Sequence, residues 1–315
     1  MTTWASSSYA IGIDVGATKI AAAWVNMETG TFGPVCRIQT RRNAPGEGIV
    51  DDIAMLLDSI LPPDGVHNGA MAAIGVAVPE LVDLYGEIRS AWNFPLPGLI
   101  ERLSSITGVP VRAESDVRAA AFAEARFGAG RGCSNFAYFS LGSGMSYTLC
   151  LEGRPYAGAH GFAIHFASSE MAVPVRDRSE LAAAIPEDYA SGIGMARLWE
   201  ERGGEPLLHG AHSLEELAAL EDPMALRVIA DGAGMGGRLI AQVVNMLDPE
   251  KIILGGGLGC STGVYRTKLE TQIRSHIWEQ SCSDIPLLVA GLGEEAGIIG
   301  AALTAWAARQ ALDVT

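Results

Sequence analysis

Apolar and polar positions recur along this chain with two different periods. Between residues 8 and 25 an apolar run enters and leaves a short polar turn, which predicts two strands joined by that turn. The run at 70–78 is continuously apolar and predicts a buried strand. Residues 49–61 and 223–247 instead carry apolar positions at helical spacing.

The rest of the chain continues this alternation. Further strands are predicted at 33–39, 110–113, 136–141, 147–151, 251–254 and 286–290. Further helices are predicted at 99–107, 117–127, 187–199, 213–220, 265–279 and 296–310. Strands that alternate with helices predict an α/β fold.

Glycines interrupt the long predicted helix. Gly232, Gly234, Gly236 and Gly237 all lie inside 223–247, and an interior glycine costs about 1 kcal/mol relative to alanine. Four together predict that another backbone or a ligand lies close to this helix.

Four turns made of small or acidic residues follow predicted strands, at 14–19, 114–116, 142–144 and 255–257. In the first, Gly16 lets the backbone approach a ligand closely. Such a turn can cradle phosphate oxygens, with Asp14 beside a hydrated Mg²⁺. The alternative is a hairpin with a polar tip. No Gly-x4-Gly-Lys-Ser/Thr loop occurs.

Length and charge narrow the class of protein. A chain of 315 residues is long enough for two domains. The net charge of −14, with no basic cluster, argues against nucleic-acid binding. Five scattered cysteines without a Cys-x-x-Cys pair predict neither a disulfide framework nor a cysteine zinc site. With neither a signal peptide nor a membrane-length apolar run, we expect a cytoplasmic protein without a membrane partner.

The motifs at the turns resemble those of the ROK family of sugar kinases and repressors, in the actin-like ATPase superfamily. The family's opening, closing and internal motifs are matched in order over most of the chain. The matching segments are Asp14-Val-Gly-Ala-Thr-Lys19, Glu114-Ser-Asp116-Val-Arg-Ala-Ala120, Leu141-Gly-Ser-Gly144, Leu254-Gly-Gly-Gly257 and Ala296-Gly-Ile-Ile-Gly-Ala-Ala302.

This resemblance implies two ribonuclease-H-like α/β lobes with a central cleft, and a homodimer. The small N-terminal lobe would comprise 1–116 plus 297–315, and the large C-terminal lobe 117–296. ATP would bind as cosubstrate with Mg²⁺. The residues implied for ATP and Mg²⁺ are Asp14, Gly16, Ala17, Thr18, Lys19, Gly142, Ser143, Gly144, Gly255, Gly256 and Gly257.

Asp116 is the catalytic candidate. It stands at the start of a predicted helix, where the free N–H groups favour a carboxylate. By spacing alone it is a plain helix N-cap. The resemblance implies that it is the general base that accepts a proton from the attacking hydroxyl.

The residues that would recognise the acceptor depart from the family pattern. His165 stands where the family has a glutamate, Ser168 replaces a histidine that binds sugar and zinc, and the cysteine-rich zinc loop is missing, so we expect no structural zinc. Ser115 replaces an asparagine, and Glu80 replaces a glycine. The expected acceptor-binding residues are Glu80, Asn93, Ser115, His165 and Glu187.

These changes predict a working kinase with an unusual acceptor. The expected reaction is ATP-dependent phosphorylation of the primary hydroxyl of a modified hexose or a sugar-like cyclitol, both known among relatives in secondary metabolism. An amino sugar is favoured, because an unpaired Glu80 carboxylate in a closing cleft needs a cationic partner. Alternatively, Glu80 points to solvent.

Three alternatives follow from the same resemblance. The first is an ordinary glucokinase. The second is a pseudo-kinase, which predicts loss of Asp14 or Asp116, although both are present. The third is a transcriptional regulator, which would carry an N-terminal helix-turn-helix, whereas only ten residues precede the first predicted strand.

Overall fold

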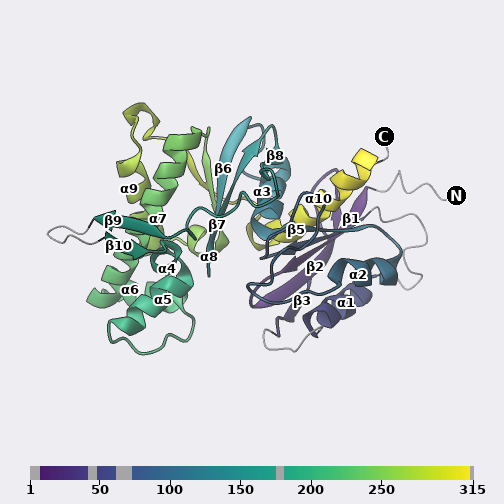
Figure 1. Ribbon diagram of the computed structural model, residues 1–315, viewed down its shortest axis with the longest axis horizontal. Helices are drawn as coiled ribbons and strands as arrows, with labels where there is room; N and C mark the ends of the chain where they lie inside the picture. Colours follow the sequence, from purple (N-terminus) through teal and green to yellow (C-terminus); the bar gives the residue numbers. More distant parts are fainter. Residues whose placement is uncertain (1–7, 42–47, 62–72, 175–180, 313–315) are drawn as a thin grey trace. The chain divides into compact units, whose positions relative to one another are not determined.

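The computed structural model describes residues 8–41, 48–61, 73–174 and 181–312. The chain divides into two units (Figure 1). The first unit draws on residues 1–132, 150–163 and 291–315, and the second on 133–149 and 164–290. The chain therefore passes between the units four times.

The first unit is built on a five-stranded sheet of order β3-β2-β1-β4-β5. Its strands are β1 (Tyr9–Val15), β2 (Lys19–Asn26), β3 (Cys36–Gln39), β4 (Ile74–Val78) and β5 (Val111–Ser115). Strand β1 pairs antiparallel with β2 and parallel with β4. Every residue of β4 is buried, as its continuous apolar sequence predicts. Residues 70–72 of the predicted strand lie outside the described residues.

In the described part of this unit, four α-helices accompany the sheet: α1 (Gly48–Ile60), α2 (Leu99–Thr107), α3 (Asp116–Phe127) and α10 (Ala296–Leu312), the last preceded by a 3₁₀ turn, η3 (Gly293–Glu295). Helix α10 packs on the sheet through glycines. A Cβ on Gly12 would lie 1.8 Å from the Ile298 carbonyl oxygen, and one on Gly75 would lie 1.8 Å from that of Ala301. Only glycine allows these approaches.

Helix α3 belongs with α10 rather than with the second unit. Gly300 lies so near α3 that an added Cβ would be 1.7 Å from the Ala119 carbonyl oxygen, and Ala119 and Ala301 share one buried cluster. The sequence-based boundary at 116/117 therefore falls inside the first unit, which continues to residue 132. The reason is this helix–helix contact, which nothing in the sequence of 117–127 indicates.

The second sheet has the order β12-β11-β6-β7-β8. Its strands are β6 (Asn135–Leu141), β7 (Met145–Leu151), β8 (Arg154–Pro155), β11 (Ile252–Gly255) and β12 (Leu287–Val289). When the strands of each sheet are numbered in chain order, both sheets have the same spatial order: third, second, first, fourth and fifth. For the second sheet this order is counted from β8 to β12. The chain leaves the second unit within β7, so that its last two residues and β8 count with the first unit. The predicted α/β class is confirmed.

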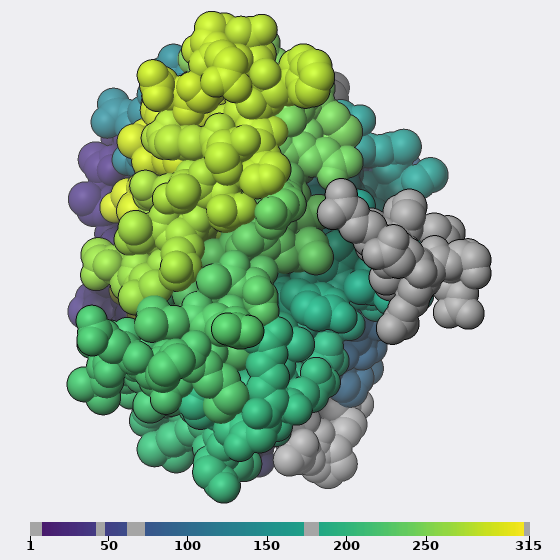
Figure 2. Space-filling model, turned by 90° about the vertical axis from the view of Figure 1, so that its left-hand side faces the viewer, coloured from purple at the N-terminus to yellow at the C-terminus, as the bar shows by residue number. Residues whose placement is uncertain are grey.

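Helices and a small hairpin complete the second unit, onto which the space-filling view looks (Figure 2). They are α4 (Glu187–Ala190), α5 (Gly192–Glu201), α6 (Ala211–Ala219), α7 (Pro223–Leu247), α8 (Gly256–Gly259), α9 (Val264–His276) and η2 (Gln280–Cys282), with β9 (Met171–Pro174) pairing with β10 (Leu181–Ala184). The hairpin was not predicted. Nowhere in the described ranges is a helix long and apolar enough to cross a membrane.

The glycines of α7 are explained by helix packing. A Cβ on Gly232 would lie 2.5 Å from the Met195 sulfur of α5, and one on Gly237 would lie 2.4 Å from the Gln272 Cβ of α9. Neighbouring helices therefore approach the backbone of α7 directly at these positions. The glycines predicted that either another backbone or a ligand lies close to this helix, and the structure shows the close approach of neighbouring helices.

Candidate active site

The predicted turn at 14–19 connects β1 to β2. The Gly16 amide donates to the Lys19 carbonyl oxygen at 2.9 Å. Thr40 holds the turn from the side, since its hydroxyl donates to the Gly16 carbonyl at 2.7 Å and its amide to that of Thr18 at 3.0 Å. The Lys19 ammonium forms an ion pair with the exposed Glu294 carboxylate at 2.5 Å. The turn is thus tight and presents the half-exposed Lys19 beside η3.

Asp14 is the penultimate residue of β1 and lies beside the first turn of α10. A Cβ on Gly297 would lie 2.6 Å from the Asp14 carboxyl carbon, so only glycine leaves this carboxylate room. The pKa of Asp14 is raised to about 7, first by burial and then by the charge of Asp116, while the charge of Lys19 opposes the rise. A half-buried carboxylate near a second one is a suitable site for a divalent cation, and oxygen is the donor that Mg²⁺ prefers. Asp14 therefore fits the metal role that the resemblance implies.

Asp116 is the first residue of α3 rather than its cap. The N-cap is Ser115, and the Asp116 carboxylate accepts a hydrogen bond from the Val117 amide at 2.7 Å. The pKa of Asp116 is raised to about 6, mainly by burial; the hydrogen bond from the Val117 amide opposes the rise, and the charge of Glu80 contributes to it. The side chain is therefore ionised at neutral pH and able to accept a proton.

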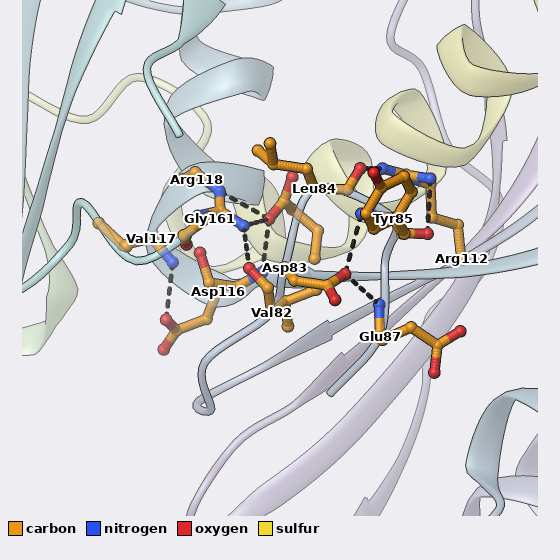
Figure 3. A network of polar contacts seen from close by, with 12 residues as sticks. Val82, Asp83, Leu84, Tyr85, Glu87, Arg112, Asp116, Val117, Arg118 and Gly161 are labelled. Carbon is orange, nitrogen blue, oxygen red and sulfur yellow. Dashed lines mark hydrogen bonds and ion pairs between the residues drawn. The ribbon is translucent and has the colours of Figure 1, made fainter. Parts of the chain in front are cut away.

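Arg118 lies two residues after Asp116, in the first turn of α3, and its side chain binds two distant segments (Figure 3). Its side chain is 2% exposed, forms an ion pair with Glu114, and donates to the carbonyl oxygens of Val82, at 2.9 Å, and Gly161. An added Cβ on Gly161 would lie 2.3 Å from the Val82 oxygen, so the two segments touch. Sequence reasoning missed this residue. The available signal was an arginine four residues after a glutamate in an otherwise small-residue motif.

Glu80 is buried, and its carboxylate is hydrogen-bonded within the protein. It is 2% exposed, and its carboxylate accepts hydrogen bonds from the Ser90 hydroxyl at 2.5 Å and from the amides of Trp92 and Asn93 at 2.9 and 2.7 Å. The Asn93 side-chain amide in turn donates to the Pro79 carbonyl at 2.5 Å. The expectation of an unpaired carboxylate that needs a cationic substrate is therefore wrong: Glu80 shapes the loop at 90–94.

Ser115 lies below the surface. The residue is fully buried, and its hydroxyl has no hydrogen-bond partner in the part of the chain that the structure describes. The contact of Ser115 with an acceptor therefore stays a prediction, made for a side chain that is buried at the end of β5.

In the second unit, two predicted acceptor residues lie together. Glu187 accepts hydrogen bonds from the Ser168 hydroxyl and from the Met145 amide, both at 2.7 Å, and His165 Nδ1 lies 3.4 Å from the Ser168 oxygen. An added Cβ on Gly144 would lie 2.9 Å from Glu187 Oε1, so this glycine admits the carboxylate. Partial burial lowers the pKa of His165, while Glu187 opposes the shift, so the imidazole is neutral at pH 7.

The predicted turns at 142–144 and 255–257 line one cavity of the second unit. Its volume is about 560 Å³, and it is bordered by Gly142, Ser143 and Gly257, together with residues of α5 and α6. The chain at 256–259 is a short helix, α8, rather than a plain turn. Gly256 has a φ of +75°, and a Cβ there would lie 2.4 Å from the Leu141 oxygen, which ties β11 to β6. This volume is sufficient for a nucleoside.

Sequence reasoning missed the other side of this cavity. Polar side chains from α5, α6 and the connection between them line it: Arg197, Glu200, His209, His212 and Glu215. They carry no motif, so spacing offers no signal for them. Across the described ranges, no group of three or more His, Cys, Asp or Glu side chains is arranged to hold a metal ion.

Comparison with known proteins identifies the family. Residues 10–308 match the ROK family. The chain is 28% identical to the N-acetylgalactosamine kinase AgaK of Shewanella sp. strain ANA-3, over 93% of this chain and 95% of the relative. It is 26% identical to a glucokinase of Halalkalibacterium halodurans, over 94% of each chain.

A solved structure extends this likeness to three dimensions. The ROK family glucokinase from Streptomyces griseus, in complex with glucose and AMPPNP, superposes with a TM-score of 0.77 at 26% identity, over 94% of this chain and 99% of that one. The expected fold class of two ribonuclease-H-like units is thereby confirmed.

Proposed function

The chain belongs to the ROK family, and we propose that this phosphotransferase uses ATP to phosphorylate the primary hydroxyl of a modified hexose. The observation that carries the proposal is Asp116, a half-buried carboxylate at the start of α3 whose pKa of about 6 leaves it ionised at neutral pH. A base in this state accepts a proton as the hydroxyl attacks phosphorus.

The proposed step is an in-line transfer. The acceptor oxygen bonds to the γ-phosphorus, the bond from that phosphorus to the bridging oxygen breaks, and ADP leaves. The hydroxyl proton passes to the Asp116 carboxylate. Bound Mg²⁺, held through Asp14, would neutralise the charge on the phosphates. The small residues at 142–144 and 255–257 would receive the nucleotide in the cavity of the second unit.

For the acceptor, we propose an N-acetylated amino hexose. The buried Glu80 already accepts hydrogen bonds from the 90–94 loop, so it offers no partner to a free ammonium group. His165 replaces a carboxylate of the family pattern, and a neutral imidazole can donate to an amide carbonyl, which a carboxylate cannot do. A relative named as an N-acetylgalactosamine kinase supports this choice. A neutral cyclitol is the second candidate, because Ser168 and Glu187 can bind hydroxyls.

The test is a comparison of kcat/KM for glucose, N-acetylgalactosamine, N-acetylmannosamine, 2-amino-glucose and a carbocyclic analogue, each with ATP. We expect an N-acetyl sugar to exceed glucose by at least about tenfold, since buried polar groups left unpaired cost ~1–3 kcal/mol each. His165→Glu should narrow that ratio. If glucose wins by tenfold or more, the protein is an ordinary glucokinase. If a nucleotide binds and no acceptor is phosphorylated, the pseudo-kinase alternative is correct.

A further inference from the structure

A second cavity lies in the first unit, apart from Asp14 and Asp116. Its volume is about 260 Å³. One wall comes from β5 and α3, another from the β8 segment, and the third from the small residues of α10. The residues that define its chemistry are Arg112, Glu114, Arg118, Phe122, Arg154 and Ala308.

Positive charge is concentrated in this cavity. Glu114 neutralises Arg118. Arg112 donates to the carbonyl oxygens of Tyr85 and Leu84, at 2.9 and 2.5 Å, and the Arg154 guanidinium lies 6.0 Å from the centre of the Phe122 ring. Among the described residues, neither Arg112 nor Arg154 has a carboxylate partner. Two uncompensated guanidinium groups thus line one concave site in a chain whose net charge is −14.

We propose that this cavity binds a small organic phosphate, that is, a phosphate group on a compact apolar body. Guanidinium groups bind phosphate through paired N–H donors, and Arg112 and Arg154 both retain donors beyond the contacts described. The ring of Phe122 and the alanines of α10 supply an apolar wall for the rest of the molecule. The mixed lining favours such an ester over inorganic phosphate.

A ligand in this cavity lies beside two arginines, Arg112 and Arg118, that also bind the segment at 82–85. The two arginines bind the backbone at 82, 84 and 85, which Figure 3 shows on one side of Asp116. An anion bound to Arg112 interacts with the same guanidinium group that donates hydrogen bonds to the carbonyl oxygens of Leu84 and Tyr85. The bound ester and this loop therefore share Arg112.

The experiment is calorimetric titration of the full chain with phenyl phosphate, inorganic phosphate and phenol, with and without a saturating non-hydrolysable ATP analogue. We expect phenyl phosphate to bind more tightly than either fragment, and the nucleotide analogue to leave binding in place. Arg154→Gln should weaken binding at least about tenfold, as expected when one charge-assisted phosphate contact is lost. Arg126→Gln is the matched control, because Arg126 also stacks on a phenylalanine and is exposed outside the cavity.

Three results would overturn the proposal. One is equal binding by wild type, Arg154→Gln and Arg126→Gln. Another is full competition by the nucleotide analogue, which would place phosphate in the nucleotide site. The third is absence of binding to the wild type. Arg112→Lys keeps the positive charge but removes the paired N–H donors of the guanidinium group. We therefore expect phenyl phosphate to bind this variant with an affinity between those of wild type and Arg154→Gln. Unchanged binding would contradict the role of Arg112. None of these outcomes depends on kinase turnover.

Discussion

The carboxylates of Asp14 and Asp116 interact electrostatically within the first unit: after burial, the charge of Asp116 is the largest factor that raises the pKa of Asp14. Both groups lie at the carboxyl edge of the first sheet, Asp14 near the end of β1 and Asp116 just after β5, with β4 between these two strands. Asp116 is ionised at neutral pH, and the pKa of Asp14 is about 7, so ionising both acids in the empty protein is unfavourable, and a bound cation relieves this repulsion. The first two predictions follow from this pair.

Asp116→Asn should abolish most of the activity while the fold and nucleotide binding persist. An amide cannot accept the hydroxyl proton, so kcat should fall by at least ~100-fold. Steady-state kinetics and nucleotide titration provide the measurement. Asp58→Asn, an exposed acid on α1, is the matched control and should keep full activity. Near-normal turnover by Asp116→Asn would remove it from the base role.

The same substitution should stabilise the protein at neutral pH. The folded pKa of Asp116, about 6, lies above its ordinary value of 3.8, so folding favours the protonated acid. Its contribution to stability is fully present below about pH 4 and is lost as pH rises through about 6. Chemical denaturation at pH 4 and pH 8 should show Asp116→Asn gaining on wild type by roughly 1–3 kcal/mol at the higher pH only. A gain that is equal at both pH values would contradict burial of the charge.

Glu80→Gln should loosen the loop at 90–94. The carboxylate accepts hydrogen bonds at both oxygens from this loop, whereas glutamine offers one acceptor and places an NH₂ group against amide donors. We expect a loss of about 1–3 kcal/mol in the free energy of unfolding, measured by urea titration. Glu87→Gln, on an exposed side chain nearby, should change it little. If Glu80 were instead a contact for the acceptor, KM would rise without loss of stability.

Zinc should be absent in stoichiometric amount from the purified protein. The family's zinc histidine is Ser168 here, and its hydroxyl donates to Glu187 instead. Elemental analysis measures this directly, with the protein passed through a metal-free buffer. One tightly held zinc ion per chain would contradict the prediction, as would loss of fold on chelation.

Local patterns predicted most of the elements. The predicted helix at 223–247 coincides with α7, and the predicted strand at 136–141 differs from β6 by one residue. The predicted helix at 187–199 is divided in two, because the Ser191 hydroxyl accepts from the Gly194 amide and caps a new helix. A serine before a helical segment is a common N-cap, so this break could have been predicted from the sequence.

The site was predictable where its chemistry is local in the chain. Asp14, Asp116 and the glycine turns each lie within a short motif beside a strand. Arg118 was missed and Glu80 was misjudged because their partners are distant: Arg118 binds carbonyls 36 and 43 residues away, and Glu80 binds a loop 10 to 14 residues away. A sequence pattern does not indicate which backbone carbonyl a buried side chain will meet.

The packing of α10 against Gly12, Gly75 and α3 has a consequence for biosynthesis. A ribosome completes residues 133–149 and 164–290, the whole second unit, before it makes the helix that covers the first sheet. The opposite order, with the N-terminal domain folding first, is usual during synthesis. Here the first strands to emerge expose glycines shaped for a helix that has not yet been translated. Strands β1 and β4 therefore lack their native cover until the ribosome has completed α10.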